Sequence, residues 1–465
     1  MGEKVSRRRF LEVAGGTIAG LVVGGVIGRL TAPAKEVTAE AAAKKYPKIT
    51  FIGWRYRPDI VEDNVKFFTA YYGIPVHYEA YGSGEEYAAK MTSLFTGGGP
   101  VDVCYVRDGD APSWVKAGWL VDVEEVAPSD KIEMYKKELS PGALEILTFD
   151  GKLYGLPYYG DVMAFIYNRR MLAEVGWTKP PETWEEVTEV CLDVKKAGLC
   201  PEPLQLTLVN IDCDLWRTWQ VMTFSRGGSL FDEDNNPTWE DPNSPAYEAI
   251  EWMWEAINTH KIATTKSFSM AHEDCSAALA ADPPVGFCEI VHAYELFGLN
   301  TPGHFPRSGA TYEGKPEWAQ ALMPGKTHMT ATYCRFYGMT KICKDRGKDA
   351  MEAAWQLIEF MGGKDKTGIY RVAKRWALEA GLGFHQLPLF DDPDIKESLR
   401  KWADPEIKRK QQELSRRESG VDKPYYRDFM TIAGPEIQSA LANQKPLKDV
   451  LKFAADKWRE LKAKG

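Results

Sequence analysis

The stretch Lys48-Ile-Thr-Phe-Ile-Gly-Trp54 begins the part of the chain that decides the fold. An apolar run that ends near a glycine predicts a buried first strand. Two amphipathic helices and two further strands follow it, at residues 61–72, 85–95, 74–80 and 101–106. Strands that alternate with helices in this way predict a parallel sheet with crossover helices, and hence an α/β lobe.

Three residues follow the ends of these strands. Trp54 closes the first strand, and Arg107 and Asp108 come directly after the third. Ligands of such sheets bind outside the carboxyl ends of the strands, so these residues are candidates for a binding site.

The later chain continues to mix helices and strands. Thr183-Trp-Glu-Glu186 forms a capping box after two prolines and predicts a helix start. Further helices are predicted at residues 212–226, 245–258 and 350–361, and a buried strand at 285–290. No internal repeat, low-complexity tract or long linker is found, which favours interleaved lobes.

The N-terminal residues have the pattern of an export signal. Ser6-Arg-Arg-Arg-Phe-Leu11 precedes an apolar stretch and then Ala32-Pro-Ala34, a small-residue cleavage site. This pattern resembles the twin-arginine export signal. Residues 1–34 are therefore predicted to be an export signal or, alternatively, an uncleaved anchor, and residues 35–45 a tether. The expected location is the outer face of the cytoplasmic membrane, periplasmic or cell-surface.

The charge composition limits the kinds of partner that the chain is expected to bind. The formal charge is −8, and leaving out the five basic and two acidic residues of positions 1–34 brings it to −11. So acidic a body repels phosphate backbones, and nucleic acid is not expected as a partner. Aromatic residues make up 12% of the chain; a large core accounts for most of them, and a minority could line a ligand site.

The numbers and spacings of the cysteines and histidines bear on disulfides and metal sites. Eight cysteines are an even number, which in an exported protein fits disulfides, with Cys191/Cys200 and Cys334/Cys343 nearest in sequence. The seven histidines show no HExxH or HxH spacing, and no CxxC occurs. We therefore expect no metal site and no cofactor.

One segment resembles a known family. Tyr154-Gly-Leu-Pro-Tyr-Tyr-Gly-Asp161, followed by Tyr167-Asn168 and Pro181-Glu-Thr-Trp-Glu-Glu186, is similar to the most recognisable stretch of the family 1 extracellular solute-binding proteins. These are the maltose-binding type of receptor of ABC importers. Shorter similarities occur, in the family's order, at residues 90–102, 118–122, 227–231 and 353–361.

The resemblance implies two α/β lobes, each a mostly parallel sheet flanked by helices, with a ligand cleft between them. The chain would cross between lobes near residues 156–161, 287–291 and 333–337. Lobe 1 would then comprise 46–157 and 290–333, and lobe 2 158–289 and 334–465. The chain departs from the family at Cys288–His292 and at Tyr333–Arg335, which leaves the ligand open.

Further site candidates come from this arrangement. Tyr158, Tyr159, Asp161, Glu289 and Arg335 lie at the inferred crossings, although a salt bridge between lobes is an alternative role for Glu289 and Arg335. Trp216, Trp219 and Trp376 add aromatic rings, and a helical tryptophan pair can equally belong to a core.

The expected function is that of a non-catalytic, monomeric receptor that closes around a sugar or oligosaccharide and delivers it to the permease of an ABC importer. Aromatic platforms suit sugar faces, and charged side chains suit their hydroxyls. The alternatives are a non-sugar solute (glycerol phosphate, another anion, a polyamine or a metal chelate), a secreted glycoside hydrolase with a carboxylate pair, and a structural surface protein. The twin-arginine machinery is the other expected partner.

Overall fold

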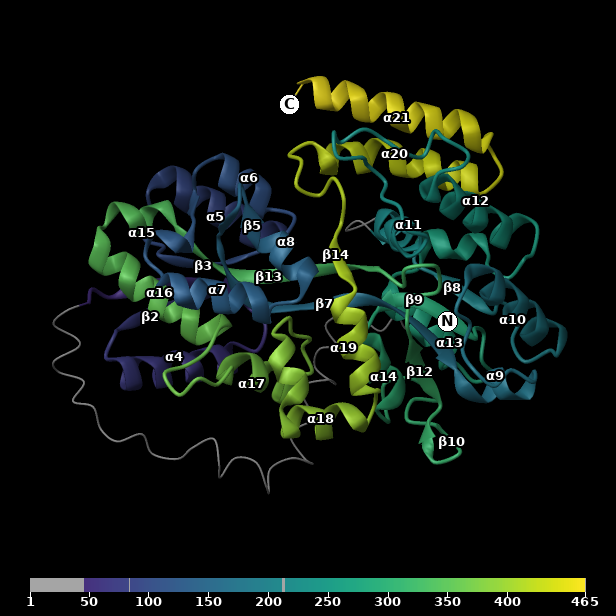
Figure 1. Cartoon of the computed structure of the whole chain (residues 1–465), viewed down its shortest axis with the longest axis horizontal. Helices are drawn as coiled ribbons and strands as arrows, with labels where there is room; N and C mark the ends of the chain where they lie inside the picture. Colours follow the sequence, from purple (N-terminus) through teal and green to yellow (C-terminus); the bar gives the residue numbers. More distant parts are fainter. Residues whose placement is uncertain (1–45, 83, 211–213, 465) are drawn as a thin grey trace, which may run out of the picture.

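Two long strands link the two halves of the molecule. The computed structural model describes residues 46–82, 84–210 and 214–464. Figure 1 shows two bodies of strands and helices, with β7 (Gly155–Asn168) and β13 (Thr330–Thr340) running between them. We call the body that contains the first three strands lobe 1 and the other lobe 2. The predicted two-lobed α/β fold is confirmed.

Lobe 1 begins with the alternation of strands and helices that the sequence predicted. It runs through β1 (Ile49–Trp54), α4 (Pro58–Tyr72), β2 (Val76–Tyr81), α5 (Glu85–Gly97) and β3 (Val103–Val106). The first strand pairs in parallel with both of the others. Because the strands are parallel, their carboxyl ends, including Trp54, meet at one edge of the sheet.

The crossing strands pair first with each other and then with different lobes. β7 lies antiparallel to β13 between Gly155 and Val162. Its second half pairs with β9 (Cys288–His292) and β12 (Trp318–Ala321), whereas β13 pairs with β3 of lobe 1. The side chains of these two strands therefore reach the boundary between the lobes.

Lobe 2 is built on the same sheet. β8 (Leu204–Leu206) pairs in parallel with β9, so the strand order across the molecule is β2-β1-β3-β13-β7-β9-β8. Its helices are α10 (Trp184–Lys196), α11 (Asp214–Ser225), α12 (Pro245–Asn258), α13 (His272–Leu279), α20 (Tyr426–Leu441) and α21 (Leu447–Lys464). Parallel pairing is thus found within the lobes. The crossing strands are antiparallel to each other and to β3, β9 and β12, whereas β14 pairs in parallel with β13.

The helix starts have local causes that the sequence displays. The Thr183 hydroxyl accepts a hydrogen bond from the Glu186 amide at 3.1 Å and caps α10. Ser244 does the same for α12, accepting from the Tyr247 amide at 3.1 Å, with Pro245 in the first turn.

The remaining elements complete the two lobes. They are α6 (Ala111–Lys116), β4 (Leu120–Val121), η2 (Val123–Glu125), α7 (Ser129–Glu138), α8 (Pro141–Leu147), β5 (Thr148–Phe149), β6 (Lys152–Leu153), α9 (Arg169–Glu174), η3 (Thr265–Ser269), α14 (Glu295–Asn300), β10 (Thr311–Tyr312), β11 (Lys315–Pro316), α15 (Lys341–Asp345), α16 (Lys348–Gly362), α17 (Arg371–Ala380), η4 (Leu387–Asp391), α18 (Pro393–Arg400), α19 (Pro405–Glu413) and β14 (Ser415–Arg417).

The cores correct the predicted division into lobes. Residues 290–333 were assigned to lobe 1, but Val291, Leu296 and Trp318 share a core with Ala164 of β7 in lobe 2. Conversely, the segment 334–399, assigned to lobe 2, contributes to the core of lobe 1 around β1 and β3.

The error lies in the crossing predicted near residues 287–291. That buried run is β9, which has β7 on one side and β8 on the other within lobe 2. A central strand buried on both faces has the same apolar pattern as a strand that crosses between lobes, so the sequence did not separate them. The last return to lobe 2 falls between Leu399 and Tyr426.

The described cysteines are free and buried. Cys104, Cys191, Cys200, Cys275, Cys288, Cys334 and Cys343 carry thiols, and Cys213 lies outside the described residues. Neither Cys191/Cys200 nor Cys334/Cys343 is bonded. The Sγ atoms of Cys191 and Cys288 are 3.6 Å apart. Burial raises the pKa of Cys200 to about 12, which keeps its thiol protonated and unreactive.

Candidate ligand-binding cleft

An aromatic wall lies on lobe 1 at the end of β1. The Trp54 ring stacks on Tyr56 at a centroid distance of 4.7 Å and on Tyr159 of β7 at 5.6 Å. Tyr56 in turn contacts Trp376 of α17 at 6.3 Å. Trp54 and Tyr159, predicted from the strand end and the crossing, are therefore brought together, and Trp376 supports them from the core, where it is 1% exposed.

Further rings continue the wall toward lobe 2. Tyr159 meets Tyr333 of β13 edge-on at 6.1 Å, and Tyr333 meets His292 of β9 at 4.8 Å. His292 also stacks with Tyr294 at 5.4 Å. A continuous row of rings thus runs from lobe 1 across the crossing strands to lobe 2.

Charged side chains lie beside this row. Arg335 of β13 forms an ion pair with Asp108, which follows β3, and its guanidinium lies 5.3 Å from the centre of the Tyr333 ring. Arg107 pairs with Asp110 at 2.5 Å. The predicted residues Arg107, Asp108 and Arg335 therefore lie at the lobe boundary, and each charge has a partner.

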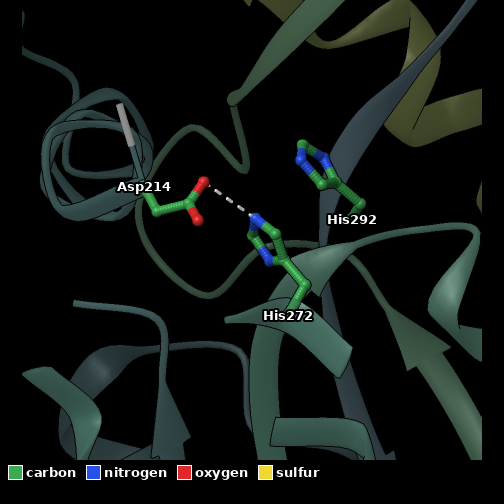
Figure 2. A group of neighbouring side chains, drawn as sticks. All are labelled: Asp214, His272 and His292. Carbon is green, nitrogen blue, oxygen red and sulfur yellow. Dashed lines mark hydrogen bonds and ion pairs between the residues drawn. The ribbon is translucent and has the colours of Figure 1, made fainter. Parts of the chain in front are cut away.

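Lobe 2 contributes a polar wall that the sequence analysis did not identify. Arg217 of α11 binds Glu418 at 2.6 Å and lies 3.5 Å from Asp214. Nε2 of His272 lies 3.1 Å from Oδ1 of Asp214, and His292 completes the group (Figure 2). The i, i+3 spacing of Asp214 and Arg217 at a helix start could have indicated an ion pair in the sequence. The two histidines lie far apart in the chain, so nothing in the sequence indicated that they meet.

Two side chains at the boundary between the lobes keep part of their surface exposed. Tyr294 is 37% exposed, yet burial raises its pKa well above the usual value. Arg335 is 22% exposed in its side chain, and burial lowers its pKa. Both side chains are partly open to solvent at the lobe boundary, where we place the candidate cleft.

Several predicted site residues lie away from the cleft. Trp216 and Trp219 are fully buried in lobe 2 against Phe429 and Trp239, because α11 is a central helix of that core. Glu289 is fully buried and accepts a hydrogen bond from the Ser276 hydroxyl at 3.0 Å, and burial raises its pKa well above the usual value.

Two more candidates sit just behind the aromatic wall. Tyr158 is 2% exposed and packs against Tyr337 and Trp376. Asp161 is 3% exposed and accepts from the Val162 amide at 2.9 Å, and burial raises its pKa. Tyr158 is the extra residue of a bulge in β7, since Tyr159 pairs with Arg335 of β13 and Pro157 pairs with Phe336.

Two hollows lie elsewhere on the surface. The larger, about 430 Å³, is lined by Trp184, Arg226 and Glu248 among others in lobe 2, and the Arg226 guanidinium lies over the Trp184 ring. The second, about 300 Å³, lies in lobe 1 beside Lys131 and Trp355. None of the predicted site residues lines either hollow.

Two lobes joined by crossing strands, with a cleft of rings and charges between them, define a binding-protein architecture. Residues 55–274, just under half of the chain, match the family of bacterial extracellular solute-binding proteins. The resemblance noted in the sequence is thereby confirmed.

Individual relatives are distant. The diacetylchitobiose binding protein DasA of Streptomyces coelicolor is 25% identical over 149 residues, 32% of each chain. The matched segments cover between 24% and 43% of the first three curated relatives.

Solved structures match over almost the whole chain. The cyclic alpha-maltosyl-1,6-maltose binding protein of Arthrobacter globiformis has a TM-score of 0.71 and 17% identity, and covers 90% of this chain and 100% of its own. Maltose-bound MalE3 of T. maritima has a TM-score of 0.67 and 19% identity, with 89% and 99% covered. At this identity the likeness establishes the fold alone.

The predicted export signal and tether, residues 1–34 and 35–45, lie outside the described residues. In the part of the chain that is described, none of the helices combines the length and apolar character that a bilayer crossing requires.

Proposed function

We propose that this chain is the extracytoplasmic solute-binding receptor of an ABC importer and that it captures a sugar or oligosaccharide between its lobes. The observation that carries this proposal is the stacked row of Trp54, Tyr56 and Tyr159 at the cleft. Aromatic faces stack on the apolar C–H faces of sugar rings, and the neighbouring charged pairs can bind hydroxyl groups.

The charges favour a neutral solute over an anion. Arg335 is paired with Asp108 and Arg217 with Glu418, so both of these guanidinium groups already have a carboxylate partner. An anionic solute would compete with these carboxylates, whereas a hydroxyl group can bind to an ion pair without displacing either member. Related proteins named for diacetylchitobiose and maltotriose support the same choice.

The ion pairs at the lobe boundary also favour binding without catalysis. Asp108 and Asp110, the carboxylates at the end of β3, are held by Arg335 and Arg107. Each of these carboxylates already contacts a guanidinium, so neither is presented as a member of the free carboxyl pair that glycoside hydrolysis uses. The protein would therefore close on its solute and release it unchanged to the permease.

The solute class is tested by melting the purified protein with a panel of mono- and oligosaccharides. A ligand at one hundred times its Kd adds about 2.7 kcal/mol to the stability of the folded state, which raises the melting temperature. We expect such a rise with at least one sugar. A rise with glycerol phosphate or spermidine alone would overturn the sugar assignment, and release of reducing ends from oligosaccharides would overturn the receptor assignment.

Export through the twin-arginine machinery is the second part of the proposal, with a monomer at the outer face of the membrane. It rests on Arg7-Arg8-Arg9 before Phe10-Leu11. Replacing the arginines with lysine keeps the positive charge and removes the pair that the export receptor reads. The variant is expected to stay in the cytoplasm, and normal export of it would contradict this route.

A further inference from the structure

Three potential metal ligands converge in the polar wall of lobe 2. Asp214 is the first residue of α11, His272 the first of α13 and His292 the last of β9. One oxygen or nitrogen atom of each lies within 4.8 Å of the other two, and the three residues are 7–8% exposed. Figure 2 shows the side chains pointing toward one another from these separate elements.

The ligand types and spacing suit a small divalent ion. Imidazole nitrogen and carboxylate oxygen bind Zn²⁺ at about 2.0–2.2 Å, which places neighbouring tetrahedral ligands roughly 3.3 Å apart. The distance from His272 Nε2 to Asp214 Oδ1 is 3.1 Å, already close to that value. Because the ligand atoms all lie within 4.8 Å of one another, the His292 ring must move by at most about 1.5 Å to complete such a site, within the reach of a side-chain rotation.

The surrounding contacts leave ligand atoms available. The Thr207 hydroxyl lies 3.4 Å from Nδ1 of His272, which leaves Nε2 of that ring facing Asp214. Nδ1 of His292 is buried and has no hydrogen-bond partner among the described residues. A buried imidazole whose ring position is held by few hydrogen bonds can turn toward an ion at low cost.

The local charge also favours a cation. Arg217 lies 3.5 Å from Nε2 of His292, but its positive charge is balanced by Glu418 at 2.6 Å. With both imidazoles neutral, Asp214, Arg217 and Glu418 together carry a formal charge of −1. A dication therefore enters a site of opposite net charge.

We propose that Asp214, His272 and His292 bind one divalent transition-metal ion of the Zn²⁺ class in the lobe 2 wall of the cleft. Three protein ligands leave a coordination position for water or for an oxygen atom of a bound solute. The ring of His292 contacts Tyr333 and Tyr294 of the cleft, so the ion would border the solute. The separate chain positions of the three ligands explain why histidine spacing predicted no metal site.

The test uses the full chain, stripped with a chelator and titrated with Zn²⁺ by calorimetry and with Co²⁺ by visible absorption, without any sugar. We expect one ion per chain and a Co²⁺ spectrum typical of nitrogen and oxygen ligands. His292→Gln and His272→Ala should each weaken binding at least tenfold. His77→Ala is the control, because His77 is exposed on β2 and pairs with Glu79.

Folding of each variant is checked by circular dichroism, and His292→Gln, which keeps the side chain polar and similar in size, serves if His272→Ala does not fold. Absence of stoichiometric binding, or equal binding by His292→Gln and the native chain, would overturn the proposal. Because no sugar is present, failure here leaves the receptor function standing, and failure of the sugar panel leaves the metal site standing.

Discussion

The two walls of the cleft differ in chemistry. Lobe 1 and the crossing strands present stacked rings, with Trp54 between Tyr56 and Tyr159. Lobe 2 presents ionisable groups, with Arg217 in contact with both Glu418 and Asp214. One wall suits the face of a ring and the other suits polar substituents, so neither lobe alone meets both requirements of a sugar. This division gives a physical reason for closure of the lobes on a bound solute.

Breaking the lobe 2 wall should have the largest effect. Arg217→Ala leaves Glu418, which is 3% exposed, as a buried carboxylate without its guanidinium. Loss of one partner of a buried pair costs about 3–5 kcal/mol of unfolding free energy, measured by urea denaturation. Arg459→Ala is the control, since Arg459 pairs with Glu240 at the surface and should cost less than about 1 kcal/mol. Similar losses for the two variants would contradict this account of the wall.

The stability of the folded chain should depend on pH through His385, which is hydrogen-bonded to the crossing strand β13. His385 is fully buried, with Nε2 2.9 Å from the Tyr333 carbonyl oxygen and Nδ1 2.9 Å from the Ser140 hydroxyl. Burial lowers the pKa of His385 from 6.5 to about 4. The unfolded chain therefore binds the proton more tightly, and stability is lost as the pH falls from about 6.5 to 4.

This loss amounts to about 3 kcal/mol at its full extent. His385→Gln does not titrate in this range, so urea denaturation between pH 4 and 7 should show a flatter dependence for the variant. An unchanged dependence would show that His385 does not govern acid stability.

Removing the central ring of the lobe 1 wall should affect binding more than folding. Trp54→Ala is expected to weaken binding of the identified sugar by about 1–3 kcal/mol, measured by calorimetry. Trp177→Ala is the matched control, because Trp177 lies outside the cleft and donates to Asp193 at 3.1 Å. Equal affinities of the two variants would place the solute elsewhere.

The contact across the lobes should matter least. Arg427 of α20 in lobe 2 lies 3.6 Å from Asp110 of lobe 1, and its side chain is 62% exposed. Arg427→Ala should weaken sugar binding by at most about 1 kcal/mol at low salt, and high salt should remove the difference. A larger loss that persists at high salt would make this pair part of the binding site itself.

The sequence predicted what depends on local pattern. Trp54, Arg107 and Asp108 were predicted as site residues because they follow strand ends, and the α/β order was predicted because apolar periodicity is local. The ion pair of Asp108 with Arg335 joins residues 227 positions apart, and a sequence alone does not show such contacts.

The errors have the same origin. Trp216 and Trp219 are spaced to lie on one face of a helix, and this spacing is the same whether the face lines a core or a cleft. Both side chains are buried in the core. The run at β9 reads as a buried strand whether it lies within a lobe or crosses between lobes. Asp214, His272 and His292 meet only when three elements pack, so no spacing rule marks them.

Closure of two unlike walls on a solute is tested most directly by small-angle X-ray scattering with and without the sugar that raises the melting temperature. The account predicts that the radius of gyration falls when the sugar is added and that Trp54→Ala needs more sugar for the same change. A radius of gyration that stays constant while the sugar is bound would contradict it.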